Sequence, residues 1–351
     1  PGRACAGSTQ SGHAGARMRK CRGRALLMVL VALAVMMSVA AGLSVRYHAL
    51  MSETAQLLDS FQARWYARAS DTMAVKIIKQ DISDSGGSVN LSQYWAQEGR
   101  TFPVEGGTIG GYVSDEQTCF NVNAINTKIT GEDNFKNGKE DYVPYLRQVF
   151  HDLLVRLEIP ENDADIITDS LADFIDLNQD LISSNGAENP WYAGQKYPYR
   201  IPDGPVYDIS EIRLVRGMTP EFYRRIRPFV CALPDSKFVI NINTMRQFNM
   251  PLLAALFLDS SVSEDEAWNM LAERPADGYP AGADFVFSDQ AMGRESDYTK
   301  VMLKEIIGVT SSYFNVHSVI TYGDVTSRYS TKIQKVNGKM VAVSSAPEEE
   351  Q

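Results

Sequence analysis

Hydrophobic residues follow a helical period over the longest regular segment of the chain, which lies near its amino end. Residues 25–45 are an uncharged run of 21 residues rich in Leu, Val, Ala and Met, long enough at ~1.5 Å per residue to cross the hydrocarbon core of a bilayer. From Arg46 to Asp81 there is no Pro or Gly, and apolar residues recur every three to five positions, as in an amphipathic helix. The pattern therefore predicts one continuous helix over 24–82.

A membrane anchor and a cleaved signal peptide are the two interpretations of the apolar run. Small residues at 38–41 (Ser-Val-Ala-Ala) suit signal cleavage, but the apolar region of a signal peptide usually has about 7–15 residues. The helical pattern also continues past this point without a break. We favour the anchor, and the basic residues before it predict a cytoplasmic amino end and an exported body.

Beyond residue 82 the pattern changes repeatedly between alternation and helical spacing. Ser-Asp-Ser-Gly-Gly at 83–87 ends the long helix, and Asn337-Gly338 indicates a β-hairpin. Alternation predicts strands at 108–113, 119–123, 237–243, 312–322, 327–336 and 339–343. Helical spacing predicts helices at 142–157, 164–177, 209–215, 220–230, 244–258 and 263–273. This order predicts an α+β domain with a helical domain inserted between its strands.

Local signals add detail at the edges of the helical block. Thr244 is expected to cap the helix that runs to Leu258, with Pro251 as a kink or interruption. Segments 120–123 and 239–243 both end in Asn-x-Asn, which suits turn or cap positions.

Charge is unevenly distributed along the chain. The formal net charge is −9, but the first 23 residues hold five basic and no acidic groups, so the remainder has 29 basic against 43 acidic residues. A body this acidic lacks the positive surface that binds phosphate backbones, so no nucleic-acid partner is expected. Four cysteines are too few for a disulfide scaffold.

The cysteines divide between the two sides of the predicted anchor. Cys119 and Cys231 lie in the exported part, at the two edges of the helical block. In an oxidising compartment they can pair, and closing a loop of about 110 residues is worth roughly 4–5 kcal/mol in the chain-entropy model. Two buried free thiols are the alternative.

An acidic loop inside the helical block is the strongest candidate site. Asp176, Asn178 and Asp180 present oxygen side chains at alternate positions, and Glu188 follows eight residues later. Hard oxygen ligands of this kind suit Ca²⁺. The loop is not an EF-hand, because Leu181 stands where that motif needs glycine. A solvated acidic loop at the end of a helix is the competing interpretation.

Enzyme signatures are absent or incomplete. The chain has no Gly-x-Ser-x-Gly, no His-Glu-x-x-His and no intact P-loop. His151 falls in a helical pattern and His317 in a strand pattern, which are structural positions. The segment around Gly217 resembles a helix-hairpin-helix, but in so acidic a body the packing of two short helices is the preferred interpretation. The sequence therefore predicts a non-enzymatic function, with carboxylate pairs of the glycosidase kind left open.

The amino end resembles a type IV pilin or pseudopilin. A short basic leader from Met18 precedes Gly23 and the long apolar helix. The resemblance implies that a prepilin peptidase cleaves between Gly23 and Arg24 and that Arg24 becomes the methylated amino terminus. Most members carry a glutamate at the fifth mature position, where this chain has Met28.

Five further segments are similar to the K-type minor pseudopilins of type II secretion, the general secretion pathway protein K family. These segments are 119–125, 173–180, 186–189, 209–218 and 240–244. The resemblance implies a pilin fold with a large inserted α-domain that binds structural calcium, and we carry the ligands onto Asp176, Asn178, Asp180 and Glu188. Asn189 departs from the aspartate that the family often has. K-type members also lack the glutamate replaced by Met28.

The resemblance implies the following divisions. They are an upstream extension and basic leader at 1–23, a transmembrane and spine helix at 24–82, a pilin β-domain at 83–123 and 235–343, an inserted α-domain at 124–234, and a disordered tail at 344–351. Residues 1–17, which precede the first methionine, are interpreted as the extension.

The implied function is assembly. A K-type protein is a single-pass protein of the inner membrane with its bulk in the periplasm, and with the I- and J-type minor pseudopilins it initiates and caps the pseudopilus that drives protein export. A membrane-anchored periplasmic hydrolase or binding protein is the main alternative. A major pilin is a weaker one, since the inserted block and Met28 argue against it.

Overall fold

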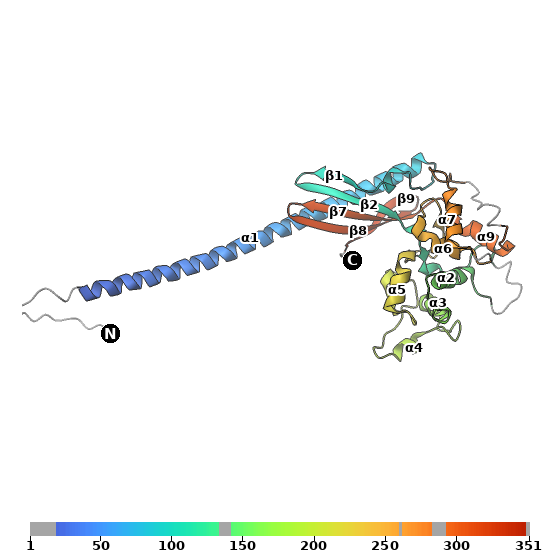
Figure 1. Cartoon of the computed structure of the whole chain (residues 1–351), viewed down its shortest axis with the longest axis horizontal. Helices are drawn as coiled ribbons and strands as arrows, with labels where there is room; N and C mark the ends of the chain where they lie inside the picture. The colour runs from blue at the N-terminus through green and yellow to red at the C-terminus, as the bar shows by residue number, and fades with distance from the viewer. Residues whose placement is uncertain (1–18, 133–141, 260–261, 283–292, 349–351) are drawn as a thin grey trace, which may run out of the picture. The chain divides into compact units, whose positions relative to one another are not determined.

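The structure is a computed structural model that describes residues 19–132, 142–259, 262–282 and 293–348 (Figure 1). The expected extension, 1–17, lies outside the described residues. The chain divides into two compact units, of which the first ends at Gln62 and the second begins at Ala63.

Helix α1 (Arg19–Asp84) is the longest element, and it ends where the Ser-Asp-Ser-Gly-Gly segment begins to break the pattern. In the described part of the chain, it contains an 18-residue stretch with a mean hydropathy of 2.6, none of which is buried. The predicted long amino-terminal helix is thus confirmed, and its apolar segment is a candidate single-pass membrane anchor.

The second unit contains an antiparallel five-stranded sheet in the order β1-β2-β7-β8-β9. Its strands are β1 (Arg100–Val104), β2 (Gly107–Asp115), β7 (Tyr313–Tyr322), β8 (Val325–Val336) and β9 (Lys339–Pro347). Ala74 and Ile78 of α1 form one buried cluster with Phe314 and Ile333 of the sheet. The small alanine side chain lets the helix approach the strands closely. The antiparallel sheet and the α+β class are confirmed.

Strand β9 corrects the expectation of a disordered tail at 344–351. Residues 344–347 belong to the strand, Ser345 pairs with Thr331, and the Thr331 hydroxyl donates to Ser345 Oγ at 2.8 Å. A register shift between Lys332 and Ile333 allows the pairing to continue. Polar residues are tolerated because β9 is an edge strand whose side chains are mostly exposed. Residues 349–351 lie outside the described part.

The block between β2 and β7 is mainly helical. Its α-helices are α2 (Tyr145–Arg156), α3 (Glu161–Ile175), α4 (Asn189–Ala193), α5 (Pro220–Ile226), α6 (Met250–Ala255), α7 (Glu264–Ala272) and α9 (Asp297–Ile306). Its short strands are β3 (Phe120–Asn121), β4 (Val230–Cys231), β5 (Ile240–Asn241) and β6 (Ile307–Gly308). The described part of the second unit contains 3-10 helices at Tyr94–Ala96, Glu116–Thr118, Val122–Ala124, Ile209–Leu214, Arg227–Phe229 and Gln247–Asn249.

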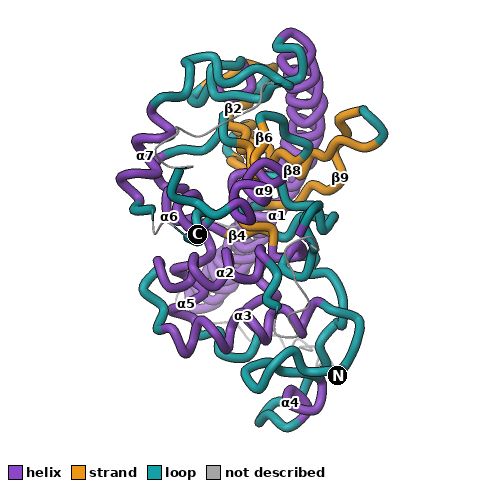
Figure 2. The backbone as a smooth tube through the Cα atoms, turned by 90° about the vertical axis from the view of Figure 1, so that its right-hand side faces the viewer, coloured by secondary structure: helices purple, strands orange, loops and turns teal. Residues whose placement is uncertain are grey.

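The core of this block does not stop at the boundary expected at residue 234. Phe150 and Leu171 share one buried cluster with Leu253 and Met302, so helices on both sides of that boundary pack together (Figure 2). The strand pattern at 237–243 produces only the two-residue parallel pairing of β5 with β6. The five-stranded sheet therefore resumes at Tyr313 rather than near 235.

Three local predictions within the block need correction. Thr244 does not cap a helix, because its hydroxyl donates to the buried Asp115 Oδ2 at 2.6 Å. Pro251 is no kink: it lies in the first turn of α6, where no intrahelical N–H donor is needed. The segment Ile209–Leu214 is a 3-10 helix rather than an α-helix.

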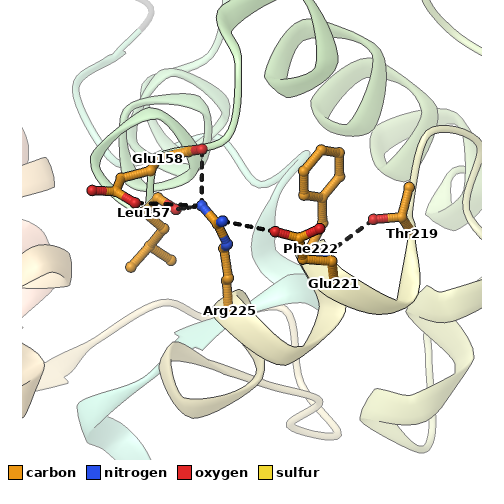
Figure 3. Close-up of polar contacts among 6 residues, drawn as sticks. All are labelled: Leu157, Glu158, Thr219, Glu221, Phe222 and Arg225. Carbon is orange, nitrogen blue, oxygen red and sulfur yellow. Dashed lines mark hydrogen bonds and ion pairs between the residues drawn. The ribbon is translucent and has the colours of Figure 1, made fainter.

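Arg225 fastens α5 to the end of α2 (Figure 3). Its Nη1 donates to the Glu158 carbonyl at 3.1 Å and to the Leu157 carbonyl at 3.4 Å, while Nη2 donates to Glu221 Oε1 at 2.8 Å. Thr219 caps α5 by accepting from the Phe222 amide. A guanidinium here satisfies carbonyls left without partners at the end of a helix.

Candidate metal centre

The acidic loop begins where α3 ends. Asp176 has extended backbone angles, and its amide donates to the Ala172 carbonyl. The Asp176 carboxylate then accepts from the Asn178 amide at 3.1 Å, and Asn178 Oδ1 accepts from the Asp180 amide at 2.7 Å. These successive Asx turns lead the chain away from the helix.

The fold brings together only part of the expected ligand set. Carboxylate oxygens of Asp173, Asp176 and Glu188 lie within 4.8 Å of one another. Asn178 and Asp180 are exposed and shape the turns, and the Asp180 carboxylate is not one of the three in this cluster. Asp173 was missing from the expected set. Its signal was its position three residues before Asp176, on the same face of a helix.

Several buried carboxylate oxygens of the cluster lack a hydrogen-bond partner among the described residues. Asp173 is 0% exposed and Glu188 is 3% exposed. Among the described residues, both Glu188 carboxylate oxygens and Asp173 Oδ2 have no hydrogen-bond partner. A Cβ at Gly186 would lie 2.0 Å from Asp173 Oδ2, so only glycine fits beside that oxygen. Buried carboxylates without partners are costly, and a cation held among them would remove this cost.

The pKa values of the cluster carboxyls also favour a bound cation. Burial raises the pKa of Glu188 to about 7, and the nearby Asp173 and Asp176 charges add to this. Burial likewise raises the pKa of Asp173 to about 6. These carboxyls resist ionisation because burial disfavours their charged forms and neighbouring carboxylates repel them. The all-oxygen donor set fits a hard divalent cation.

The remaining residues singled out by the sequence occupy other parts of the molecule. Cys119 and Cys231 are joined by a disulfide with an S–S distance of 1.96 Å, beside the parallel pairing of β3 and β4. This bridge closes the base of the first half of the inserted block. Gly23 and Arg24 lie in the first turns of α1.

Comparisons with known proteins place the chain in one family. Two family models, both described as Type II secretion system (T2SS), protein K, match residues 118–235 and 240–305. The chain is 35% identical to type II secretion system protein K of Aeromonas hydrophila, over 89% of this chain and 93% of that protein. It is 39% identical to the Klebsiella pneumoniae protein K, over 76% of this chain and 78% of that protein.

The fold also matches a solved structure. A chain in the crystal structure of the GspK-GspI-GspJ complex from the enterotoxigenic Escherichia coli type 2 secretion system aligns with a TM-score of 0.71 and 29% identity, over 85% of this chain and 100% of that chain. Two family models match the inserted block, and the two relatives are matched over 93% and 78% of their own length. The chain belongs to the type II secretion system protein K family, the K-type minor pseudopilins.

Proposed function

We propose that this protein forms the tip of the periplasmic pseudopilus, together with I- and J-type minor pseudopilins, and helps to initiate its assembly. The observation that carries the proposal is the large block inserted between β2 and β7, which are neighbours in the sheet. A head enlarged in this way would obstruct a subunit stacked above it. The likeness to a chain of the GspK-GspI-GspJ complex supports the choice of partners.

The spine helix offers a surface for these partners. In the first unit, beyond the apolar run, Leu58 is 64% exposed and Phe61 is 62% exposed. Large apolar side chains exposed on a helix mark an interaction surface. Packing against the spine helices of neighbouring pseudopilins would bury them.

The proposed topology follows from the anchor and the leader. The helix crosses the inner membrane once, with its amino end in the cytoplasm and the body in the periplasm. Prepilin peptidase cleaves between Gly23 and Arg24, and the new amino terminus is methylated. Met28 avoids a charge in the lipid that would have no partner at the end of a filament.

The acidic cluster is proposed to hold one structural Ca²⁺. Asp173, Asp176 and Glu188 would supply the carboxylate ligands, and the orphaned oxygens described above support the fit. Bound calcium would neutralise these carboxylates and hold the loop before α4 against the end of α3. Asn178 and Asp180 would act through the turns rather than as ligands.

One group of side chains resembles a catalytic Ser-His-Glu arrangement, but its contacts do not favour a catalytic role. Ser114 Oγ lies 3.4 Å from His317 Nε2, and His317 Nδ1 lies 3.0 Å from Glu348 Oε1. However, the Ser114 hydroxyl donates to Glu116 Oε1 at 3.0 Å, and a carboxylate at that position competes with the histidine for its proton. We propose a non-enzymatic protein, and labelling of Ser114 by a fluorophosphonate probe would argue for the hydrolase alternative.

The test of the tip proposal is the position of the head in assembled filaments. The full-length protein, tagged at its carboxyl end with a gold label, is produced with the I-type, J-type and major pseudopilins, and the filaments are viewed by electron microscopy. We expect at most one label per filament, at one end. A labelled major pseudopilin, as control, should decorate the whole length. Labels of the K-type protein along the shaft would refute the proposal.

A further inference from the structure

Arg147 is held beside the acidic cluster, and among the described residues it forms no ion pair with the carboxylates of the cluster. Arg147 lies on α2, and its Nη2 donates to Asn126 Oδ1 at 2.9 Å. Asn126 in turn donates to the Ala172 carbonyl at 2.6 Å. Ala172 directly precedes Asp173, so this relay fixes the guanidinium beside the last turn of α3, which carries Asp173 and leads into Asp176.

The environment of Arg147 is unusual for an arginine. Its Nε is buried and has no hydrogen-bond partner among the described residues. The ion pairs of the described part of the chain do not include it. A guanidinium remains charged in proteins, so a desolvated positive charge is kept close to carboxylates but not in contact with them.

Three carboxylates on α3 and at its carboxyl end act on Arg147. Burial lowers the pKa of Arg147, while the carboxylates of Asp169, Asp173 and Asp176 raise it. Burial raises the pKa of Asp176, and Arg147 is among the groups that lower it. The carboxyl end of α3 adds the negative end of a helix dipole. Arg147 is therefore a counter-charge for the end of this helix.

We infer that Arg147 is a built-in competitor of the bound cation, which supports the acidic cluster when it is empty and weakens its affinity for Ca²⁺. The inference rests on the proposed calcium site. In the empty cluster the arginine offsets part of the repulsion between the carboxylates. When a cation enters, the two positive charges repel each other through a poorly solvated region, where such interactions are only partly screened. A tight structural site thereby becomes one that can respond to the calcium concentration.

The experiment measures calcium affinity by titration calorimetry on the full-length protein in detergent. R147Q removes the charge but keeps a donor for Asn126, whereas R147K keeps the charge. R246Q is the matched control, since Arg246 pairs with Glu98 away from the cluster. We expect R147Q to bind Ca²⁺ about three- to tenfold more tightly at low salt, and this gain to shrink near 0.5 M salt. R147K and R246Q should stay close to the unmodified protein.

The direction in which R147Q changes the Ca²⁺ affinity distinguishes a competitor from a residue with a merely structural role. If Arg147 only packs α2 against α3, R147Q binds Ca²⁺ more weakly or equally, and the inference is refuted. If R147Q does not fold, N126D is measured in its place, because it puts a carboxylate against the Arg147 guanidinium. Unchanged or weaker Ca²⁺ binding by N126D would then refute the inference. Absence of calcium binding by the unmodified protein would refute the site itself, whereas binding that is indifferent to Arg147 would refute only its role as competitor.

Discussion

The ligand set expected from the sequence differs from the carboxylate cluster in the structure, and Glu188 and Asp180 show this difference. Both Glu188 carboxylate oxygens are buried and have no hydrogen-bond partner in the described part of the chain, whereas Asp180 is exposed and its amide completes an Asx turn. Because a ligand that binds only the folded state stabilises it, saturating Ca²⁺ should raise the melting temperature by about 5 °C. E188Q should abolish this rise in a thermal-unfolding experiment, and D180N should keep most of it. If both variants lost the rise in melting temperature equally, Asp180 would be a ligand.

The raised pKa values of the cluster predict an unusual pH dependence in the absence of calcium. The pKa is raised to about 6 for Asp173 and to about 7 for Glu188. A group whose pKa is higher in the folded state contributes stability that is complete below its unfolded pKa. That stability is lost as the pH rises through the folded value.

With a chelator present, the melting temperature should therefore fall from about pH 4.5 to about pH 7.5 as these carboxyls ionise. Added Ca²⁺ should reverse the trend, because the ion binds the ionised forms. E188Q should flatten the chelator curve at its upper end. A chelator curve that rises steadily to neutrality would contradict the pKa directions.

The candidate site could be predicted from the sequence only in part. Asp176 and Glu188 were recognisable because oxygen side chains cluster around a helix end, and this signal is local. Asp173 was hidden inside a regular helical stripe, where a polar residue reads as one more exposed position. Its burial depends on the loop that returns through Gly186, whose missing side chain leaves room for the Asp173 carboxylate.

At the scale of elements, the disulfide closes a long loop that contains α2 to α5. Cys119 and Cys231 are 112 residues apart, and the chain-entropy model assigns roughly 4–5 kcal/mol to a loop of this length. The double variant C119A/C231A should lose that much free energy of unfolding in denaturant titrations. Reductant should affect the unmodified protein and leave the double variant unchanged. A loss below about 1 kcal/mol would mean that the unfolded state is already compact.

The contact between α5 and the end of α2 is held by a side chain that is 36% exposed, so its contribution is screened. R225M should lower the free energy of unfolding by about 1 kcal/mol, since two terminal carbonyls lose their charged donor. Arg224 is exposed on the same short helix, which makes R224M the matched control with no expected effect. Equal effects of the two variants would show that charge on α5 matters and the cap does not.

At the scale of the whole molecule, one helix is shared between two environments. Its segment 25–45 is apolar on all sides, while its last turns contribute alanine and isoleucine to the core beneath the sheet. The protein isolated from membranes should begin at Arg24 and carry a methyl group, as determined by mass spectrometry of its amino-terminal peptide. G23L should retain the leader. A mature terminus near Ala41 would instead indicate cleavage by signal peptidase.

Two segments of the second unit show where local sequence patterns fail to predict the structure. Alternation at 237–243 looked like the return of the main sheet, but it forms a two-residue pairing inside the helical block. A polar stretch at 344–347 looked disordered, but it completes an edge strand. In both segments the residues suit more than one structure, and the choice depends on which distant strand is available as a partner.

The amino-acid sequence by itself determined the candidate anchor, the long helix, the α+β class and most strands of the sheet. These features depend on hydrophobic periodicity, which is set by residues close together along the chain. Tertiary structure alone decided that both halves of the inserted block share one core, that Asp173 joins Asp176 and Glu188, and that Arg147 stands beside them. These arrangements bring together side chains from separate helices and loops, and their distances exist only once the chain has folded around a common interior.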